Sequence, residues 1–357
     1  MEHDDLTGQL YMKRCLELAK LGMGAVAPNP MVGAVLVYQN RIIGEGYHQQ
    51  FGGPHAEVNA INSVPAEQKH LIELSTLYVS LEPCSHYGKT PPCTELILKH
   101  KIPHVVIACL DPFPEVAGRG IQMLQHAGVK VTYGVLETEA RELNRRFITF
   151  HTQQKPWVML KWAQTLDGYF AQNSQSQTWI TNAYSRTLVH KWRSEEQAIM
   201  IGTTTATTDN PQLNVRLWFG RSPLRIVLDQ NLTLPQNLHI FDQSIPTLIV
   251  SEQAVPMNEW KQNLSYLQTT FDEQLLTQIL QHLYQTGIQS VIVEGGRVLI
   301  EAFILQNLWN EARVFTGLTR WGEGISVPRL PQTAKLLSEE NIDTDRLEYW
   351  VNSLQTY

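Results

Sequence analysis

The hydrophobic and polar positions of the first 150 residues alternate between the periods of helices and strands. Residues 10–21 have the spacing of a helix, and PNPMVGAVLVY and RIIGEGYH are then predicted as strands paired around a turn at Gln39 and Asn40. Further strands are predicted at TLYVSL, HVVIAC and VKVTYGV, and further helices at 55–63, 94–100 and 119–126. This alternation predicts a sheet covered by helices.

The pattern begins again after a polar stretch, HTQQK, at 151–155. Strands are predicted in WVMLKWAQTLDGYFA, PLRIVLD, TLIV and QSVIVEGG, and helices at 182–195, 273–286 and 298–307. A boundary near residue 150 divides the chain into domains 1–150 and 151–357, which agrees with a length prior of about 150 residues per domain. Both domains are predicted to be α/β.

The composition is that of an ordinary globular protein, with 43% hydrophobic residues, 17% charged residues and a net charge of −6. The densest basic run is ARELNRRF at 140–147, and a solvated helix face is favoured there over a nucleic-acid site. The acidic start, MEHDDLTGQL, and the lack of a long apolar run favour a cytoplasmic protein without a membrane segment. We therefore expect a small-molecule partner, with no nucleic acid and no membrane, and leave a homo-oligomer open.

The strongest chemical signal lies in PHAEVNA and LEPCSHYGKTPPC, between residues 54 and 93. His55, Cys84 and Cys93 are candidate zinc ligands, and three protein ligands are typical of a catalytic zinc that keeps a position for water. Glu57 is a carboxylate that stays off the metal and is free to carry protons during a hydrolytic deamination. Its spacing from His55 matches the HxE signature of zinc deaminases.

The two cysteines are separated by eight residues, where that signature has two. We expect Cys84 where a strand ends, near the start of the predicted helix, because a helix N-terminus favours the thiolate. The alternative is that His55 only begins a helix and that both cysteines are buried hydrophobes. Cys15 and Cys109 lie in apolar stretches and are predicted to be core residues.

The ordered set PNPMVGAVLV, PHAEVNA, PCSHYGKTPPC, KWAQTLDGYFA, TWIT, TDNPQLNVR and VEGGRVL resembles the bifunctional riboflavin-biosynthesis deaminase-reductases along nearly the whole chain. The resemblance implies a cytidine-deaminase-like three-layer domain, followed by a dihydrofolate-reductase-like domain. It also implies two activities: zinc-dependent deamination of a phosphorylated diaminopyrimidinone, and NADPH-dependent reduction of its ribosyl group to a ribityl chain.

The resemblance also implies site residues. In the deaminase, the substrate contacts would be Asn29, His48, His86 and Lys89. In the reductase, the substrate contacts would be Gln177, Arg193, Leu213, Arg216 and Glu294, with Lys161 near the reacting carbon. The NADPH contacts would be Ala163, Trp179, Thr205 and Asp209, together with the VEGG turn and the helix after it, namely Gly296, Arg297, Val298, Leu299, Ile300, Glu301 and Ala302.

Structural interpretations of the same residues remain open at this point. His48 and His86 are equally well interpreted as surface or satisfied histidines, Lys89 as a solvated loop lysine, and Arg193 as an exposed helix charge paired along KWRSEE. Trp157, Trp162 and Trp192 are predicted to be core or domain-interface aromatics. Gln177 stands where the family pattern has a serine. Two rival functions also remain, a deaminase acting on a nucleobase in RNA or on a free nucleoside, and a non-catalytic, zinc-stabilised scaffold.

Overall fold

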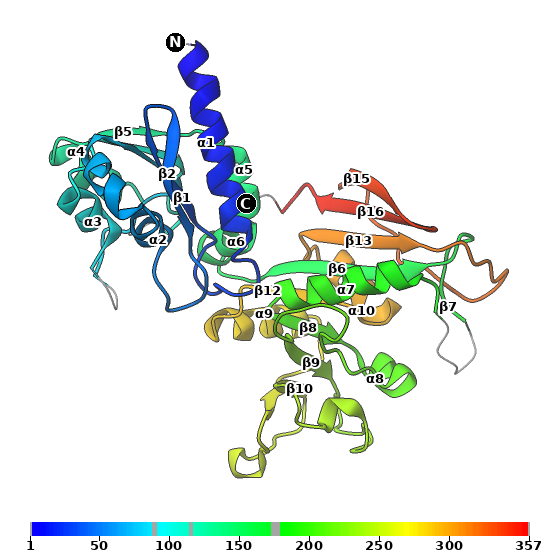
Figure 1. Cartoon of the computed structure of the whole chain (residues 1–357). Coiled ribbons are helices and arrows are strands. Elements are labelled where there is room, and N and C mark those ends of the chain that lie inside the picture. Colours follow the sequence, from blue (N-terminus) through cyan, green and yellow to red (C-terminus); the bar gives the residue numbers. More distant parts are fainter. Residues whose placement is uncertain (1, 88–90, 114–116, 173–178, 356–357) are drawn as a thin grey trace. The chain divides into compact units, whose positions relative to one another are not determined.

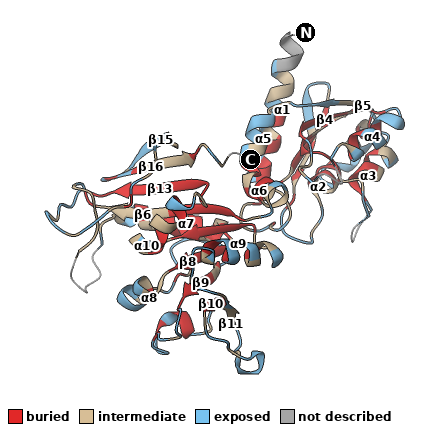
Figure 2. Ribbon diagram, turned by 180° about the vertical axis from the view of Figure 1, so that it is seen from behind, coloured by how far each residue is buried: buried red, intermediate tan, exposed pale blue. Residues whose placement is uncertain are grey.

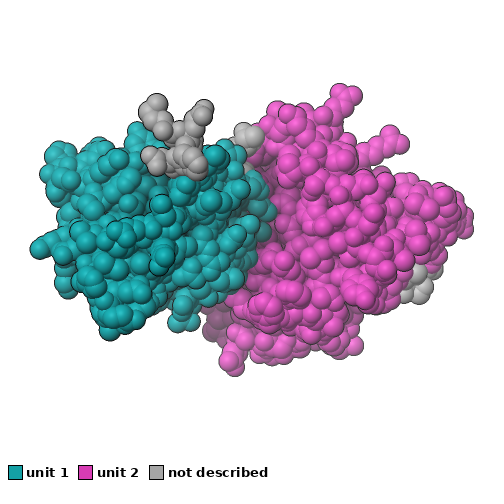
Figure 3. Space-filling model, turned by 45° about the horizontal axis from the view of Figure 1, so that its top comes forward, with its two compact units in different colours: residues 1–153 teal, residues 154–357 magenta. Residues whose placement is uncertain are grey.

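The structure is a computed structural model that describes residues 2–87, 91–113, 117–172 and 179–355. It consists of two compact units, residues 1–153 and residues 154–357, shown in two colours in Figure 3. The predicted boundary lay near 150. The polar stretch 151–155 is not entirely a linker, because its first three residues belong to helix α6 (Arg145–Gln153), which ends at the last residue of the first unit.

The first unit contains a five-stranded sheet in the order β2-β1-β3-β4-β5 (Figure 1). Its strands are β1 (Gly33–Tyr38), β2 (Arg41–Tyr47), β3 (Thr76–Leu81), β4 (His104–Cys109) and β5 (Lys130–Tyr133). β1 pairs antiparallel with β2 and β3, whereas β3, β4 and β5 are parallel. Gln39 and Asn40 have φ of 45° and 62°, which confirms the predicted hairpin turn.

Helices cover both faces of this sheet. They are α1 (Glu2–Lys20), α2 (Ala56–Asn62), the 3₁₀ helix η1 (Ala66–Leu74), α3 (Cys93–Lys99), α4 (Arg119–His126), α5 (Glu137–Leu143) and α6. Alternate residues of β1 and β4 belong to two hydrophobic clusters, one shared with α2, α3 and α4 and the other with α1 and α5. The unit therefore has three layers, and its buried strands lie between partly exposed helices (Figure 2).

The second unit contains a nine-stranded sheet in the order β11-β10-β9-β8-β12-β6-β13-β16-β15, in which the strands from β11 to β13 are parallel and β16 pairs antiparallel with both β13 and β15. Its strands are β6 (Trp157–Gln164), β8 (Ala198–Ile201), β9 (Leu224–Leu228), β10 (Thr247–Ser251), β11 (Leu264–Gln268), β12 (Ser290–Val293), β13 (Glu311–Thr316), β15 (Ala334–Ile342) and β16 (Asp345–Asn352). A separate two-stranded sheet pairs β7 (Tyr169–Ala171) with β14 (Ile325–Ser326).

Two hydrophobic clusters also lie on opposite faces of the large sheet. One contains α9 (Leu275–Gln285) and α10 (Arg297–Leu305), and the other contains α7 (Ala183–Glu195) and α8 (Thr203–Asp209). Short 3₁₀ helices occur at His239–Phe241 and Met257–Glu259. Glu294, which belongs to the candidate site described below, directly follows the carboxyl end of β12.

The predicted strands and helices are present, with some changes of length. The first helix begins at Glu2 and not at residue 10. The sequence pattern did not indicate β8, β11, β13, α8 or the hairpin of β15 and β16; β15 is exposed at most of its positions, so no alternation marks it as a strand. Trp157, Trp162 and Trp192 are buried, as predicted, and so are Cys15 and Cys109.

Two findings concern possible partners. Arg146, in the basic run ARELNRRF, is only 8% exposed, so this run is not simply a solvated helix face. Because the Arg146 side chain is buried inside the first unit, it is not part of an exposed basic surface. Among the residues that the structure describes, no helix is both long and apolar enough to cross a membrane.

Candidate active sites

Three predicted zinc ligands converge at the ends of secondary-structure elements in the first unit. His55 is the N-cap residue of α2, Cys84 follows the end of β3 by three residues, and Cys93 is the first residue of α3. His55 Nδ1 lies 3.6 Å from the Cys84 sulfur and 3.4 Å from the Cys93 sulfur. All three donor atoms lie within 4.8 Å of one another, and in the described part of the chain this group contains no fourth ligand.

These separations fit a shared zinc ion. With Zn–N of about 2.0 Å, Zn–S of about 2.3 Å and a tetrahedral angle, ligand nitrogen and sulfur atoms lie roughly 3.5 Å apart. The observed 3.6 and 3.4 Å agree with that value. The donor set of one imidazole and two sulfurs also suits zinc. The alternative, in which both cysteines are only buried hydrophobic residues, does not explain why both sulfurs face the same ring nitrogen.

The charge on the cysteines is set by their mutual contact. The Cys93 thiol and its backbone N–H, 3.2 Å from the Cys84 sulfur, lower the pKa of Cys84 to about 4. Because Cys93 begins α3, the backbone N–H involved is one that the helix leaves without an internal partner. The expectation that Cys84 lies near a helix start is therefore correct. The contact of Cys84 with the His55 ring raises the pKa of His55.

Glu57 lies in the first turn of α2, two residues after His55, and its side chain is buried. Burial, together with the negative charge of Cys84, raises the pKa of Glu57 to about 6. A carboxyl group with a pKa close to neutral can both take up and release a proton during one reaction cycle. Such a group beside three convergent ligands has the properties of a general acid–base.

Asn29 and His48 are brought together beside the ligand His55. His48 is buried, and its Nδ1 lies 3.0 Å from the Pro54 carbonyl oxygen, so Nδ1 carries the hydrogen. His48 Nε2 then accepts from the Asn29 side-chain amide at 3.0 Å, and burial lowers the pKa of His48. The ring of His48 meets the ring of His55 edge-on at 5.5 Å. His48 is thus a satisfied, neutral histidine, and not a surface one.

The other two predicted contacts of the deaminase lie in the loop between the cysteines. His86 is exposed, which agrees with its interpretation as a surface histidine and leaves it accessible to a substrate. Lys89 lies outside the described residues. The neighbouring Tyr87 hydroxyl donates to the Glu95 carboxylate of α3, which joins the exposed part of the loop to the helix that begins at Cys93.

The sequence analysis missed Glu82, which anchors the ligand loop. Its buried carboxylate accepts backbone N–H bonds from Gly118 and Gly120 at 2.9 Å, and longer ones from Asp111 and Ile121 at 3.3 and 3.4 Å. The bonded N–H groups include the first turn of α4, where a carboxylate is favoured. Glu82 precedes Cys84 by two residues, so this anchor fixes the point from which the ligand loop departs. The motif LEPC contained the residue, but nothing in it indicated the distant partners.

In the second unit, the Glu294 carboxylate binds two cationic side chains that were predicted as site residues, those of Arg193 and Lys161. Arg193 binds its carboxylate through two parallel bonds of 2.8 Å, and the Lys161 ammonium lies 3.6 Å away. Burial alone would raise the pKa of Glu294, but Arg193 and Lys161 outweigh it and lower the pKa to about 2. Burial also lowers the pKa of Lys161. Arg193 is therefore not the exposed helix charge considered as an alternative.

Arg216 belongs to the same cluster. Its backbone N–H donates to His190 Nδ1 at 3.2 Å, and its guanidinium donates to the Asn214 side-chain oxygen at 2.9 Å. Burial, followed by the nearby Arg193 and Arg216, lowers the pKa of His190 to about 4, so its ring is neutral. Arg193 also lowers the pKa of Arg216, after burial. Two guanidiniums close enough to repel each other form a ready site for an anion.

The predicted NADPH contacts are only partly accessible. Gly296 caps α10 and lies beside Thr205 of α8, because a Cβ built on Gly296 would stand 3.2 Å from the Thr205 hydroxyl. The backbone N–H groups of Leu299 and Ile300 donate to the Gly296 carbonyl, and their side chains are buried. Within 296–302, the first turn of α10 is thus the part available to a pyrophosphate, because later N–H groups serve the helix itself.

The remaining predicted residues occupy varied positions. Ala163 lies on β6, Asp209 ends α8 and is exposed, and Trp179 is 57% exposed with the Arg186 guanidinium 5.1 Å from its ring. Leu213 is buried and has a φ of 55°. Its side chain belongs to the core, so any contact with substrate would come from its backbone. Gln177 lies outside the described residues.

Comparisons with known proteins cover both units. Residues 156–344 match a family model described as the RibD C-terminal domain, and residues 7–109 match one described as the cytidine and deoxycytidylate deaminase zinc-binding region. The riboflavin biosynthesis protein RibD of Aquifex aeolicus is 40% identical over 319 residues, covering 89% of this chain and 88% of that protein. The Escherichia coli protein of the same name is 36% identical over 324 residues, covering 86% of each.

Two solved structures are similar over nearly the whole chain. A diaminohydroxyphosphoribosylaminopyrimidine deaminase/5-amino-6-(5-phosphoribosylamino)uracil reductase from Thermotoga maritima is 37% identical with a TM-score of 0.90, and covers 98% of this chain and 100% of that one. RibD of Acinetobacter baumannii is 33% identical with a TM-score of 0.88, and covers 97% and 99%. These likenesses confirm the expected α/β fold class, with a deaminase domain followed by a reductase domain.

Proposed function

The chain belongs to the RibD family, the bifunctional deaminase-reductases of riboflavin biosynthesis, and we propose how its own residues perform the two reactions. The first unit hydrolyses the amine of a diaminohydroxyphosphoribosylaminopyrimidine. The second unit reduces the ribosyl group of the resulting 5-amino-6-(5-phosphoribosylamino)uracil to a ribityl chain with NADPH. Its partner is a small phosphorylated pyrimidine, and the four free cysteines suit a reducing compartment such as the cytoplasm.

The observation that carries the deaminase assignment is the convergence of His55, Cys84 and Cys93 around one point, with the buried Glu57 beside them. These three residues would hold the zinc ion, which would supply an acidified water as the nucleophile. A Glu57 carboxylate oxygen takes up one proton as the water attacks and passes it to the ring nitrogen. It then takes the second proton from the hydroxyl group now on the ring carbon and passes it to the amine, which leaves as ammonia while the carbonyl forms.

Around this centre, other residues position the pyrimidine. His48 is held as the neutral tautomer with hydrogen on Nδ1, and it fixes the Asn29 amide by accepting one of its hydrogens. The Asn29 side chain then keeps an oxygen and a second hydrogen for the edge of the pyrimidine ring. His86, which is exposed, and Lys89 of the same intercysteine loop are proposed to face the phosphate end of the substrate.

In the reductase, NADPH supplies the hydride, and the protein supplies position and charge. The Lys161 ammonium, held by Glu294, donates a hydrogen bond to the sugar oxygen next to the carbon that is reduced. Arg216 is the principal ligand of the substrate phosphate. Arg193 adds positive charge, because its two parallel bonds to Glu294 already occupy one edge of its guanidinium.

The proposal is tested with the purified full-length protein, its zinc content measured, in the presence of the diaminopyrimidine phosphate with and without NADPH. Ammonia is expected without NADPH, and NADPH oxidation is expected only once the deaminated product is present. Ammonia is followed by a colorimetric assay that does not use a nicotinamide cofactor, so that the two readings stay independent.

Two variants divide the reactions between the units. Glu57→Gln is expected to retain zinc, to lose ammonia release by roughly 10²–10⁴-fold, and to oxidise NADPH normally when the deaminated product is supplied. Lys161→Met is the matched reciprocal variant, with normal ammonia release and impaired NADPH oxidation. Normal ammonia release by Glu57→Gln, or equal loss of both reactions in either variant, would contradict the assignment.

A further inference from the structure

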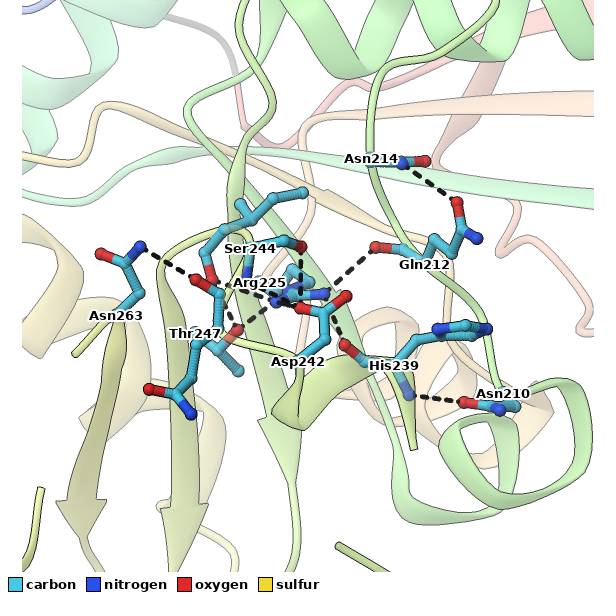
Figure 4. Close-up of polar contacts among 11 residues, drawn as sticks. Asn210, Gln212, Asn214, Arg225, His239, Asp242, Ser244, Thr247 and Asn263 are labelled. Atoms are coloured by element: carbon cyan, nitrogen blue, oxygen red, sulfur yellow. Dashed lines mark hydrogen bonds and ion pairs between the residues drawn. The ribbon is translucent and has the colours of Figure 1, made fainter. Parts of the chain in front are cut away.

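Arg225 lies on β9 and is completely buried, yet it belongs to neither predicted active site. Its Nε donates to the Thr247 hydroxyl at 2.9 Å, and its Nη2 donates to the Asp242 carboxylate at 2.8 Å and to the Ile245 carbonyl at 3.0 Å (Figure 4). Its Nη1 donates to two further carbonyls, of His239 at 2.9 Å and of Gln212 at 3.4 Å. All five N–H donors of this guanidinium are therefore used.

The bonds of Arg225 hold the segment 210–214, which follows α8. Gln212 is held directly, and Asn210 is held through His239, whose carbonyl binds Arg225 and whose N–H donates to the Asn210 side-chain oxygen at 2.8 Å. Within the segment, Asn210 and Leu213 have φ of 39° and 55°. Non-glycine residues keep such left-handed conformations only where their surroundings determine them. The hydrogen bonds from Arg225 and His239 to the segment therefore offset the conformational free energy that these two residues cost.

The same segment ends at the arginines of the reductase site. Asn214 accepts from Arg193 Nη1 through its backbone oxygen at 3.4 Å and from Arg216 Nη1 through its side-chain oxygen at 2.9 Å. Its side-chain amide donates to the Gln212 side-chain oxygen at 3.1 Å, so it is tied back to the residue that Arg225 holds. Asn214 thus provides acceptors for two like charges that otherwise repel each other.

We propose that Arg225 is a positioning residue of the reductase. Through Gln212 and Asn214, it fixes the spacing of the Arg193 and Arg216 guanidiniums before the substrate phosphate arrives. Arranging two like-charged groups in advance removes that ordering cost from binding, and the benefit is greatest for a ligand whose anionic group contacts both. The inference rests on the proposed role of Arg193 and Arg216 as phosphate contacts.

The test is a double-mutant cycle on the full-length protein, with NADPH oxidation measured against the deaminated substrate and against the same compound without its phosphate. Arg225→Lys keeps the charge but loses the branched set of donors, and Asn214→Ala removes the link to Arg216. Each single change is expected to raise KM for the phosphorylated substrate about tenfold, with kcat changed less than about twofold. KM for the compound without phosphate is expected to stay unchanged.

Because both changes interrupt one chain of contacts, the double variant should be no worse than either single variant. An increase of about a hundredfold in the double variant would mean that the two residues act independently and would overturn the proposal. The control is Asp242→Asn, which weakens the charge partner of Arg225 but leaves its bonds to Gln212 and His239, so that stability falls while KM is retained.

Two further variants keep the result interpretable. Asn210→Gly removes the second attachment of the segment and tolerates its positive φ, so it replaces Arg225→Lys if that protein does not fold, with the same expected rise in KM. Arg216→Ala separates the two levels of the argument. If Arg216→Ala leaves KM unchanged, the proposed phosphate contact is wrong; if only Arg216→Ala raises KM, the role given to Arg225 is wrong.

Discussion

Replacing Glu294 by glutamine removes the one carboxylate that holds both Arg193 and Lys161 in the reductase unit. The pKa of Glu294 is about 2 in the folded protein, against an ordinary value of 4.5. A difference of this size corresponds to about 3 kcal/mol of stability at neutral pH, which agrees with the roughly 3–5 kcal/mol lost when one member of a buried ion pair is removed. Glu294→Gln is therefore expected to destabilise the second unit by about that amount.

The chain offers a selective probe for this unit, because all nine tryptophans lie between residues 157 and 350. Tryptophan fluorescence during urea unfolding therefore reports on the second unit and not on the first. With an m-value of about 2 kcal/mol per molar urea, the midpoint of Glu294→Gln should lie about 1.5 M lower at pH 7. Glu339→Gln, which removes an exposed partner of Arg346 at 4.0 Å, is the control and should change stability by less than about 0.5 kcal/mol.

The pH dependence gives a second and independent check. The lowered pKa of Glu294 means that its stabilisation is complete above about pH 5 and is lost as the pH falls toward 2. The glutamine variant has no such titration, so its deficit relative to the original protein should shrink by more than half at pH 3. A deficit below about 0.5 kcal/mol at pH 7, or one that is the same at both pH values, would refute the reasoning.

Three further outcomes are expected in the first unit. Chelating zinc, or Cys93→Ser, should abolish ammonia release while NADPH oxidation with supplied deaminated product continues; loss of both activities would contradict the separation of the sites. Glu82→Gln should weaken zinc binding by at least about tenfold in competition with a chromophoric chelator, and less than a twofold change would argue against the anchor. Gly120→Ala should destabilise the unit by about 1–3 kcal/mol in calorimetry, because its Cβ would lie 2.2 Å from the Pro83 carbonyl oxygen. Gly8→Ala, in the same unit, serves as the tolerated control, because its Cβ would meet only the Tyr78 side chain at 3.9 Å.

The grouping of His55, Cys84 and Cys93 was predictable because the information is local. Two short motifs contain all three residues, and the helix and strand ends that carry them follow from nearby periodicity. The same holds for most strands of both sheets, whose apolar runs are continuous because the strands are buried. The hairpin of β15 and β16 was missed because its first strand is largely exposed and has no apolar run to mark it.

The supporting residues were not predictable in the same way. Glu82, His190 and Arg225 act through partners that lie elsewhere along the chain, and no spacing rule relates such a side chain to a distant backbone group. Arg193 shows the same limit, since its segment KWRSEE has the pattern of a solvated helix end, whereas the fold turns the side chain toward Glu294. The range 296–302 stays a prediction, and the sequence pattern did not show that the N–H groups of Leu299 and Ile300 donate within the helix.

By itself, the sequence determined the order of two α/β domains, the three candidate metal ligands and the likeness to one family, since these depend on residue types at short, fixed spacings. Only the tertiary structure decided that Arg193 binds Glu294 together with Lys161, and which ring nitrogen of His48 carries the hydrogen. It also decided which buried side chains hold the loops of each site. Hydrogen bonds and ion pairs depend on distances of a few ångströms between residues far apart in the chain, and only the packing of the sheets and helices sets those distances.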